Sequence, residues 1–278
     1  MIGEIREHYQ LSLNRTCRLV SVSKTAHYHE PKKKAGDDEI KTYLKALAQK
    51  HKRWGFDKMI LKAKMDKKPW NHKRFHRIYC ELGLNIRVKP RKRIPKGEAK
   101  ILTQPIQANA CWSIDFMSDA LVSGIRFRTL NVIDDYNREA LLIEPNYSLP
   151  TRRVTHLIDQ LAVERGYPKI IRVDNGPEFA SSAFKKWAAE RRILINYIQP
   201  GKPAQNGYIE RFNRTYRGDI LDMNLFSNLD DVRALTQDWL PLYNEERPHE
   251  SLAGLPPVQF ARRQQQQLIG KGENSTFN

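Results

Sequence analysis

Three acidic residues occupy local sequence contexts that suit ligands of a divalent cation. Asp115 lies within residues 111–116, an apolar stretch that predicts a buried strand. Asp174 ends a β-branched stretch, and Glu210 begins a helical stretch after a loop rich in glycine and asparagine. Three carboxylates brought close together repel one another, so one of them takes up a proton unless a cation neutralises them. The pattern predicts a cluster that binds Mg²⁺ or Mn²⁺, the ions that hard oxygen ligands select.

The spacing of these acids is a weak argument by itself. Asp174 and Glu210 are separated by 35 residues. With 15 Asp and 16 Glu in 278 residues, roughly 0.75 such pairs arise by chance, which is the risk that any short motif carries. The alternative is three unrelated capping and surface acids. The two strands and one helix predicted around them favour a shared site instead.

Four longer runs of the sequence resemble the catalytic frame of bacterial insertion-sequence transposases. The resemblance is to the insertion sequence three family, whose core is similar to retroviral integrases, and it covers residues from about 30 to 262. The last two runs are long enough to be highly specific. The four runs are residues 112–116, 173–179, 202–214 and 243–249.

This resemblance implies a ribonuclease-H-like catalytic core, a mixed five-stranded sheet with flanking helices, preceded by a small helical DNA-binding domain. It implies a DDE polynucleotidyl transferase in which Asp115, Asp174 and Glu210 hold two Mg²⁺ (or Mn²⁺) ions. Water attacks a phosphodiester at the end of the element and frees a 3′-hydroxyl. That hydroxyl then attacks another phosphodiester in the same site and joins the strands.

The same resemblance implies several partners. They are DNA (element ends and target), further copies of the chain in a homo-oligomer on DNA, and a protein from an upstream frame, as a fusion or as a separate partner. In this family the upstream frame supplies the main end-recognising helix-turn-helix, and we expect this chain to be the downstream frame alone. Two alternatives stay open: a hydrolytic nuclease of the same fold, and a catalytically inactive, element-derived DNA-binding regulator.

The formal net charge of +17 is concentrated in one part of the chain. Residues 1–100 contain 27 Lys and Arg against 10 Asp and Glu, whereas residues 101–278 contain 21 of each class. A basic module joined to an acid-bearing module favours an enzyme acting on a polyanion, against the alternative of a basic surface without a specific partner. No stretch is apolar enough to cross a membrane, and there is no signal peptide. We expect a bacterial cytoplasmic, nucleoid-associated protein whose three cysteines are buried.

Composition and periodicity divide the chain into five predicted segments. They are an N-terminal helical segment and linker (1–36), a helix-turn-helix-like domain (37–86), a basic linker (87–103), an integrase-like catalytic core with a C-terminal extension (104–262), and a disordered tail (263–278).

The basic residues of the second and third segments suit nucleic-acid contact. Ser21 or Ser23 is a candidate helix cap in the first segment, and Asn71 is predicted to cap a helix that ends at Gly83. Cations outside the apolar stripe of that helix resemble a recognition helix, against the alternative of a solvated basic face. The linker favours phosphate contact over a passive role. The predicted DNA contacts here are Lys73, Arg74, Arg77, Arg91, Lys92 and Arg93.

Strands and helices alternate along the catalytic half. The predicted strands cover residues 111–117, 126–133, 138–144, 170–174 and 193–198, and the first three form an antiparallel meander. The predicted helices cover residues 152–165, 178–191, 204–220 and 229–243, followed by an extended segment that ends near Phe260.

The predicted helix over residues 204–220 places several polar residues on one face. Glu210, Asn213, Arg214 and Arg217 follow the spacing i, i+3, i+4 and i+7. Their cations suit the phosphates of a strand that reaches the metal, against the alternative of an Arg–Glu pair that supports the helix. Asn175 and the loop before the helix are further candidates, against roles in turns. The predicted DNA contacts near the acids are Asn175, Lys202, Gln205, Asn206, Arg214 and Arg217.

Other conspicuous residues are interpreted as structural. Glu178 falls in the first turn of a predicted helix, where the helix dipole favours an acid. The remaining members of this group are the hairpin acids Asp134 and Asp135, the histidines His156 and His249, and the core tryptophans Trp54 and Trp70.

Overall fold

The computed structural model describes residues 2–28, 36–86, 102, 104–199 and 203–273. The chain forms two compact units, Met1–Tyr43 and Leu44–Asn278. The division falls inside helix α4 (Asp37–Lys50) and coincides with none of the five predicted segment boundaries, which stay predictions. Among the described residues, no helix has the length and apolarity to cross a membrane.

The described part of the first unit contains three short helices and the first half of α4. The short helices are α1 (Ile2–Tyr9), α2 (Leu13–Leu19) and α3 (Lys24–His27). Ser23 caps α3 by accepting a hydrogen bond from the backbone N–H of Ala26, as one of the two candidate caps was predicted to do. Ser21 has instead a positive φ of 55° and lies between α2 and α3.

Two further helices precede the catalytic half of the second unit. They are α5 (Phe56–Met65) and α6 (His72–Glu81). Asn71 caps α6 by accepting a hydrogen bond from the N–H of Lys73, and Gly83, with φ of 65°, follows its end, as predicted. Trp54 is buried, whereas Trp70 is half-buried and stacks on Phe75.

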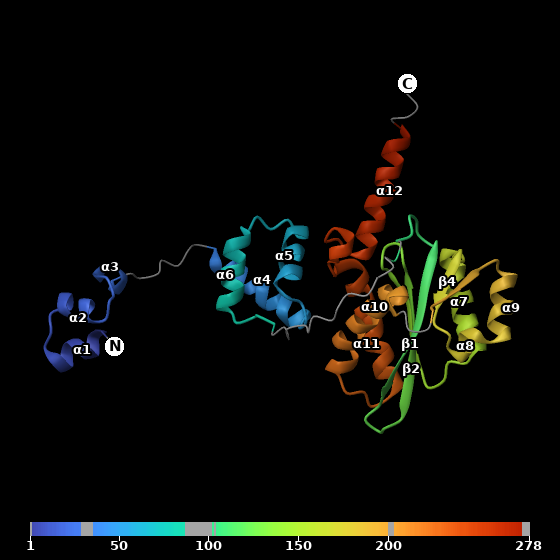
Figure 1. Ribbon diagram of the computed structural model, residues 1–278, viewed down its shortest axis with the longest axis horizontal. Helices are drawn as coiled ribbons and strands as arrows, with labels where there is room; N and C mark the ends of the chain where they lie inside the picture. Colours follow the sequence, from blue (N-terminus) through green and yellow to red (C-terminus); the bar gives the residue numbers. More distant parts are fainter. Residues whose placement is uncertain (1, 29–35, 87–101, 103, 200–202, 274–278) are drawn as a thin grey trace. The chain divides into compact units, whose positions relative to one another are not determined.

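A five-stranded sheet in the order β3-β2-β1-β4-β5 is the centre of the second unit (Figure 1). The strands are β1 (Cys111–Ala120), β2 (Arg126–Asp134), β3 (Ala140–Asn146), β4 (Ile170–Val173) and β5 (Leu194–Tyr197). The first three pair antiparallel, and β4 and β5 join parallel to β1. The predicted mixed sheet of a ribonuclease-H-like core is confirmed.

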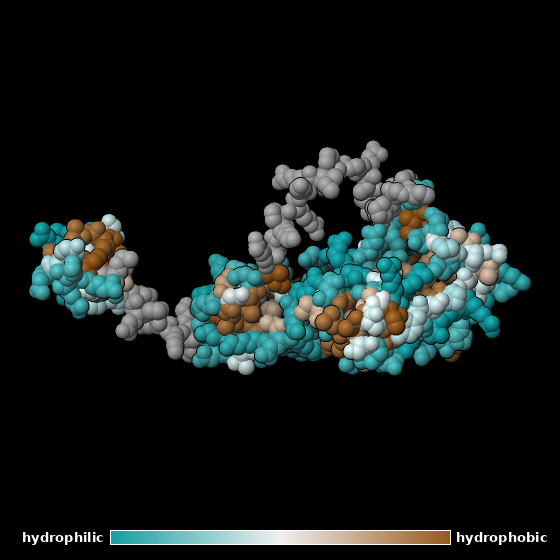
Figure 2. All heavy atoms as spheres, turned by 90° about the horizontal axis from the view of Figure 1, so that it is seen from below, coloured by the Kyte–Doolittle hydropathy of each residue, from teal (hydrophilic) through white to brown (hydrophobic). Residues whose placement is uncertain are grey.

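Helices cover both faces of this sheet (Figure 1). Alternation along β1 sends Trp112 and Ile114 into one apolar core and Met117 into the other. The first core lies under α7 (Thr151–Arg165), α8 (Pro177–Ala180) and α9 (Ser182–Glu190), and the second under α10 (Gly207–Asp219) and α11 (Leu229–Pro241). Hydrophilic side chains cover most of the surface seen in Figure 2.

Three elements differ from the prediction. The strand expected from residue 138 begins at Ala140, because Arg138 adopts a positive φ of 62° in the preceding turn. The single helix expected over residues 178–191 is two helices, since Ser181 is extended and caps α9 through the N–H of Phe184. A 3-10 turn, η1 (Pro203–Asn206), replaces the first turn of the helix expected from residue 204.

The C-terminal region departs furthest from the prediction. Helix α11 ends at Pro241 and continues as a π-helical turn, η3 (Leu242–Glu246), in which the side chain of Asn244 bonds the backbone N–H and C=O of Ala140 at 2.9 Å each. After a short 3-10 turn, η4 (Glu250–Leu252), helix α12 runs over Pro257–Glu273. The extended segment and the disordered tail from residue 263 were therefore wrong predictions over these residues. Proline at the first position and the following glutamines and arginines all suit a helix.

Candidate active site

Strand β1 carries Asp115 on the sheet face that α10 covers. Its neighbours Ile114 and Phe116 point to the opposite face, so alternation directs Asp115 toward α10. One carboxylate oxygen accepts the N–H of Phe116 at 2.8 Å. The other accepts the side-chain amide of Asn213 at 2.8 Å. Asp115 is therefore fixed by its own strand and by the helix above it.

Strand β4 brings Asp174 to the neighbouring position. β1 and β4 pair in parallel with Cys111 opposite Ile170 and Ser113 opposite Arg172. The same register, continued past the last pair, places Asp174, which follows the carboxyl end of β4, beside Asp115, which lies in the middle of β1. The carboxyl ends of parallel strands are where open α/β sheets place ligand sites. Asp174 is exposed, and its Oδ1 accepts the N–H of Gly176 at 3.0 Å.

Helix α10 carries the third acid. Glu210 lies one turn before Asn213, so the two share the helix face that meets β1. Glu210 is half-buried. The predicted cluster thus comes from two strands and one helix.

The pKa of Asp115 is affected by the charges of the other two acids, Asp174 and Glu210. This pKa is raised to about 6, first by burial and then by the charges of these two acids, against the lowering effect of the hydrogen bonds from Phe116 and Asn213. Within the described part of the chain, no three His, Cys, Asp or Glu side chains are arranged as a ready metal-ligand set. The acids are close enough to repel one another, and their oxygens do not converge on one point.

A polar relay behind Asp115 was not predicted. The side-chain oxygen of Asn213 accepts a hydrogen bond from the amide of Asn131 at 2.7 Å, while its own amide holds Asp115. Asn131 lies opposite Asp115 on β2 and is fully buried. The spacing of Glu210 and Asn213 on one helix face was visible in the sequence, whereas the pairing with Asn131 required the fold.

The two arginines predicted to contact DNA on α10 differ in their surroundings. Arg214 is exposed. Arg217 pairs with Asp119 at 3.2 Å and donates to the carbonyl of Ser118 at 2.8 Å, which ties α10 to β1. The alternative was an Arg–Glu pair that supports the helix, but the structural partner of Arg217 is Asp119 of β1. DNA contact by either arginine stays a prediction.

The loop residues near the acids make local contacts. Asn175 donates to the carbonyl of Ile198 at 2.8 Å, which links the ends of β4 and β5. Gln205 accepts the N–H of Gln199 at 3.0 Å, and Asn206 is buried. DNA contact by these residues stays a prediction, and Lys202 lies outside the described residues.

The other predicted DNA contacts lie on or after α6. Lys73 and Arg77 are exposed, Arg74 is half-buried, and Arg77 pairs with Glu81 along the helix. Their role stays a prediction. Arg91, Lys92 and Arg93 lie outside the described residues.

The acids interpreted as structural have structural partners. Asp134 accepts the backbone N–H groups of Asn109 and Tyr136, and Asp135 pairs with Arg172. Glu178 pairs with Arg128, and although burial opposes the shift, that hydrogen bond lowers the pKa of Glu178. The cysteine prediction was wrong for one residue: Cys17 and Cys111 are buried, whereas Cys80 is exposed because it lies on the outer face of α6.

Comparison with protein families agrees with the ribonuclease-H-like fold. Two models described as "Integrase core domain" match the chain, one over residues 105–203 and the other over residues 191–257. The first contains Asp115 and Asp174, and the second contains Glu210.

Relatives extend this similarity to nearly the whole chain. An uncharacterized 39.2 kDa protein of insertion element IS476 from Xanthomonas euvesicatoria is 38% identical over 94% of this chain and 75% of its own length. An uncharacterized 31.7 kDa protein of insertion element IS407 from Burkholderia multivorans is 36% identical over 94% of each chain. The putative transposase InsK of IS150 from Escherichia coli is 21% identical over 94% of this chain and 96% of its own. The chain belongs to the integrase-core transposases of insertion elements.

The structure of the chain is also similar to solved structures, at lower sequence identity than the first two relatives above. A chain of the simian T-cell lymphotropic virus intasome, in complex with PP2A regulatory subunit B56 gamma, aligns at 16% identity and a TM-score of 0.48, covering 79% of this chain and 74% of that one. The HTLV-2 integrase catalytic core domain in complex with magnesium aligns at 19% identity and a TM-score of 0.44, covering 56% and 98%.

Proposed function

We propose that this transposase cleaves DNA strands at the ends of its element and joins them to target DNA, with Asp115, Asp174 and Glu210 as the catalytic residues. The observation that supports this most strongly is the parallel register of β1 and β4, which, continued, sets Asp174, just past the end of β4, beside Asp115 in the middle of β1. The hydrogen bond from Asn213 to Asp115 adds the helix face that bears Glu210.

The chemistry of the donor set fits a pair of Mg²⁺ or Mn²⁺ ions. All three side chains offer hard carboxylate oxygens, which these ions prefer. The raised pKa of Asp115 reflects burial and like-charge repulsion that a divalent cation would relieve. Because the described residues form no ready set of three ligands, ion binding includes a movement of at least one carboxylate.

Each side chain has a distinct part in the proposed reaction. Bound ions would activate the attacking oxygen and stabilise the leaving one. Asp115, held from two sides, fixes the centre of the site, while the exposed Asp174 is open to the DNA strand. Water attack on a phosphodiester breaks the bond to the 3′-oxygen and leaves a 3′-hydroxyl. In the joining step this hydroxyl attacks a second phosphodiester, and the new P–O bond replaces the one that breaks.

The partners follow from this reaction. They are DNA (the element ends and the target) and, for two ends to be joined together, further copies of the chain. Fusion or partnership with an upstream-frame protein belongs to the same proposal. The proposed DNA contacts within the described residues are the cations of α6 and the residues near the acids, namely Lys73, Arg74, Arg77, Asn175, Gln205, Asn206, Arg214 and Arg217.

The test is a strand-joining assay on duplexes that carry the inverted repeats flanking the element. Asp115→Asn, Asp174→Asn and Glu210→Gln should each lower cleavage and joining by at least about a hundredfold, since each removes one ligand charge. DNA affinity, measured by fluorescence anisotropy, should stay within about threefold. Retained joining by Asp115→Asn would overturn the assignment.

A matched control tests whether the loss of an acidic charge away from the site also lowers joining. Asp238 is an exposed acid on α11, and Asp238→Asn should keep wild-type joining. Cleavage without joining by the wild-type chain would instead identify a hydrolytic nuclease.

A further inference from the structure

A cavity of about 300 Å³ lies on a different face of α10 from the proposed active site. Tyr208, Arg211 and Thr215 line it, at the spacing i, i+3 and i+7, whereas Glu210 and Asn213 face β1. None of the three proposed catalytic acids belongs to its lining. The cavity is therefore separate from the active site although the same helix borders both.

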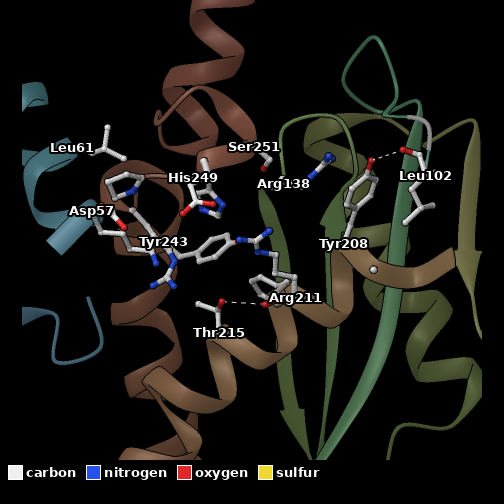
Figure 3. Close-up of a pocket in the computed structure, with 16 residues that line it drawn as sticks. Asp57, Leu61, Leu102, Arg138, Tyr208, Arg211, Thr215, Tyr243, His249 and Ser251 are labelled. Atoms are coloured by element: carbon white, nitrogen blue, oxygen red, sulfur yellow. Dashed lines mark hydrogen bonds between the residues drawn. The ribbon is translucent and has the colours of Figure 1, made fainter. Parts of the chain in front are cut away.

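Basic side chains from several elements converge on this cavity (Figure 3). Its wall contains Lys58, Arg138, Arg211 and Arg247, against two acids, Asp57 and Glu250. Arg247 already pairs with Asp219 at 3.0 Å. The remaining excess of positive charge lies in a partly enclosed space, where an anion is attracted more strongly than at an open surface.

Arg138 is the most unusual member of this wall. Its side chain is 7% exposed, and its guanidinium lies 3.4 Å from the ring centre of Tyr208. Its Nη1 has no hydrogen-bond partner within the described part of the chain. The backbone of Arg138 adopts a positive φ of 62°, a conformation that non-glycine residues rarely hold. A strained, buried arginine with an unsatisfied donor indicates a binding role.

His249 provides a second unsatisfied atom on the same wall. Its Nε2 is buried without a partner among the described residues, and its ring packs edge-on against Tyr243 at 5.1 Å. Burial and the surrounding cations, Arg247 first, lower the pKa of His249 to about 3. The imidazole is thus neutral and can donate a hydrogen bond through one ring nitrogen.

We propose that this cavity binds a phosphate group, presented by inorganic phosphate or by the backbone of DNA, through Arg138, Arg211 and His249. Guanidinium groups match phosphate oxygens in pairs, and donors left unsatisfied in the free protein gain partners on binding. The volume suits one phosphate or one nucleotide and excludes a duplex, so a DNA ligand would insert a single phosphate.

The first experiment measures binding of inorganic phosphate by isothermal titration calorimetry. The full chain is used in EDTA, so that divalent ions and catalysis play no part, with chloride matched for ionic strength. Arg211→Gln should weaken phosphate binding about tenfold, since a charged hydrogen bond is lost. Arg211 is exposed on α10, so the variant should fold normally. Arg138→Gln should weaken binding at least as much where its thermal melt shows a folded protein.

The matched control is Arg152→Gln. Arg152 is an exposed arginine of α7 outside the cavity wall, and its variant should bind phosphate as the wild type does. Absence of saturable phosphate binding, equal affinity of Arg211→Gln and wild type, or equally tight binding of acetate would each overturn the proposal.

A second experiment distinguishes the two sources of phosphate. Anisotropy of labelled duplex and single-stranded DNA is measured for the same variants in EDTA. Weaker DNA binding by Arg211→Gln but not by Arg152→Gln supports a backbone phosphate as the ligand. Unchanged DNA binding, with phosphate binding lost, supports free phosphate. Neither result depends on strand joining, so failure of the proposed catalytic function would not affect this test.

Discussion

The two faces of the central sheet are built from alternate residues of the same strands and each carries an apolar core, but the face under α10 also contains the polar residues around Asp115. On the face under α7 and α9, Trp112 and Ile114 are fully buried in an apolar core. On the face under α10, Ser113 bonds the buried Asp135, and Asp115 bonds Asn213. One strand therefore contributes stability on one side and a polar site on the other.

The difference explains how the fold tolerates Asp115, whose buried, ionised carboxylate lowers the stability of the folded state. The apolar face removes large side chains from water, which is the main stabilising effect in proteins. Around Asp115 the face under α10 is polar, and hydrogen bonds from Phe116 and Asn213 hold the carboxylate. We expect substitutions in the apolar core under α7 and α9 to change stability, and those of the polar residues around Asp115 to change activity.

The largest effect is expected from Trp112→Ala. It removes a fully buried ring from the apolar face and should lower the free energy of unfolding by about 3–5 kcal/mol, the usual range for a buried Trp→Ala change. Urea denaturation followed by circular dichroism measures the loss. Leu194→Ala, at a side chain that is 70% exposed, is the control and should change stability little. A loss below about 1 kcal/mol for Trp112→Ala would show that this face is not the main source of stability.

An intermediate effect is expected from Asn213→Ala, which removes the link between Asp115 and Asn131. Strand joining should fall about tenfold, because a misplaced ligand weakens metal binding and catalysis. Single-turnover joining rates across a magnesium titration measure the change, and higher magnesium should partly restore the rate. The control is Asn224→Ala, which removes a hydrogen bond from the Asn224 side chain to the carbonyl of Ile220 at the end of α10; it should keep wild-type joining. Equal rates for Asn213→Ala and wild type would contradict a positioning role.

The smaller of the two effects on stability is a gain from Asp115→Asn. The folded-state pKa of Asp115 is raised from 3.8 to about 6, so its ionised form destabilises the fold above pH 6. In EDTA at pH 8 the variant should be more stable by about 1–3 kcal/mol, because a rise in pKa from 3.8 to about 6 corresponds to about 3 kcal/mol and the amide loses one of the two hydrogen bonds that the carboxylate accepts. The gain should fade as pH falls from about 6 toward 3.8, where wild-type Asp115 is protonated in both states. Thermal melts across this range check it, and a constant difference at all pH values would refute it.

Sequence reasoning located the sheet and the acids because both depend on local patterns. Helix α6 begins after its predicted cap Asn71 and ends before Gly83, and the strand that holds Asp115 was expected from its apolar stretch. The resemblance implied a mixed sheet without saying which strands pair in parallel, and the parallel pairing of β1 with β4 explains why Asp174 comes near Asp115.

The remaining features depend on tertiary contacts that no local pattern shows. Asn213 had the right spacing from Glu210, but its partners on β1 and β2 lie far away in sequence. The extended backbone of Ser181, which separates α8 from α9, reflects a cap that any serine can offer. The cavity wall joins Arg138 of a strand turn with His249 of a distant segment.

The π-helical turn after Pro241 has a consequence for the rim of the sheet. β3 is an outer strand, and outer strands expose backbone groups on which a foreign strand can assemble. Asn244 occupies both groups of Ala140, the first residue of β3, with one amide side chain. The amide imitates a single residue of a sixth strand, so the start of β3 is closed to aggregation by strand addition.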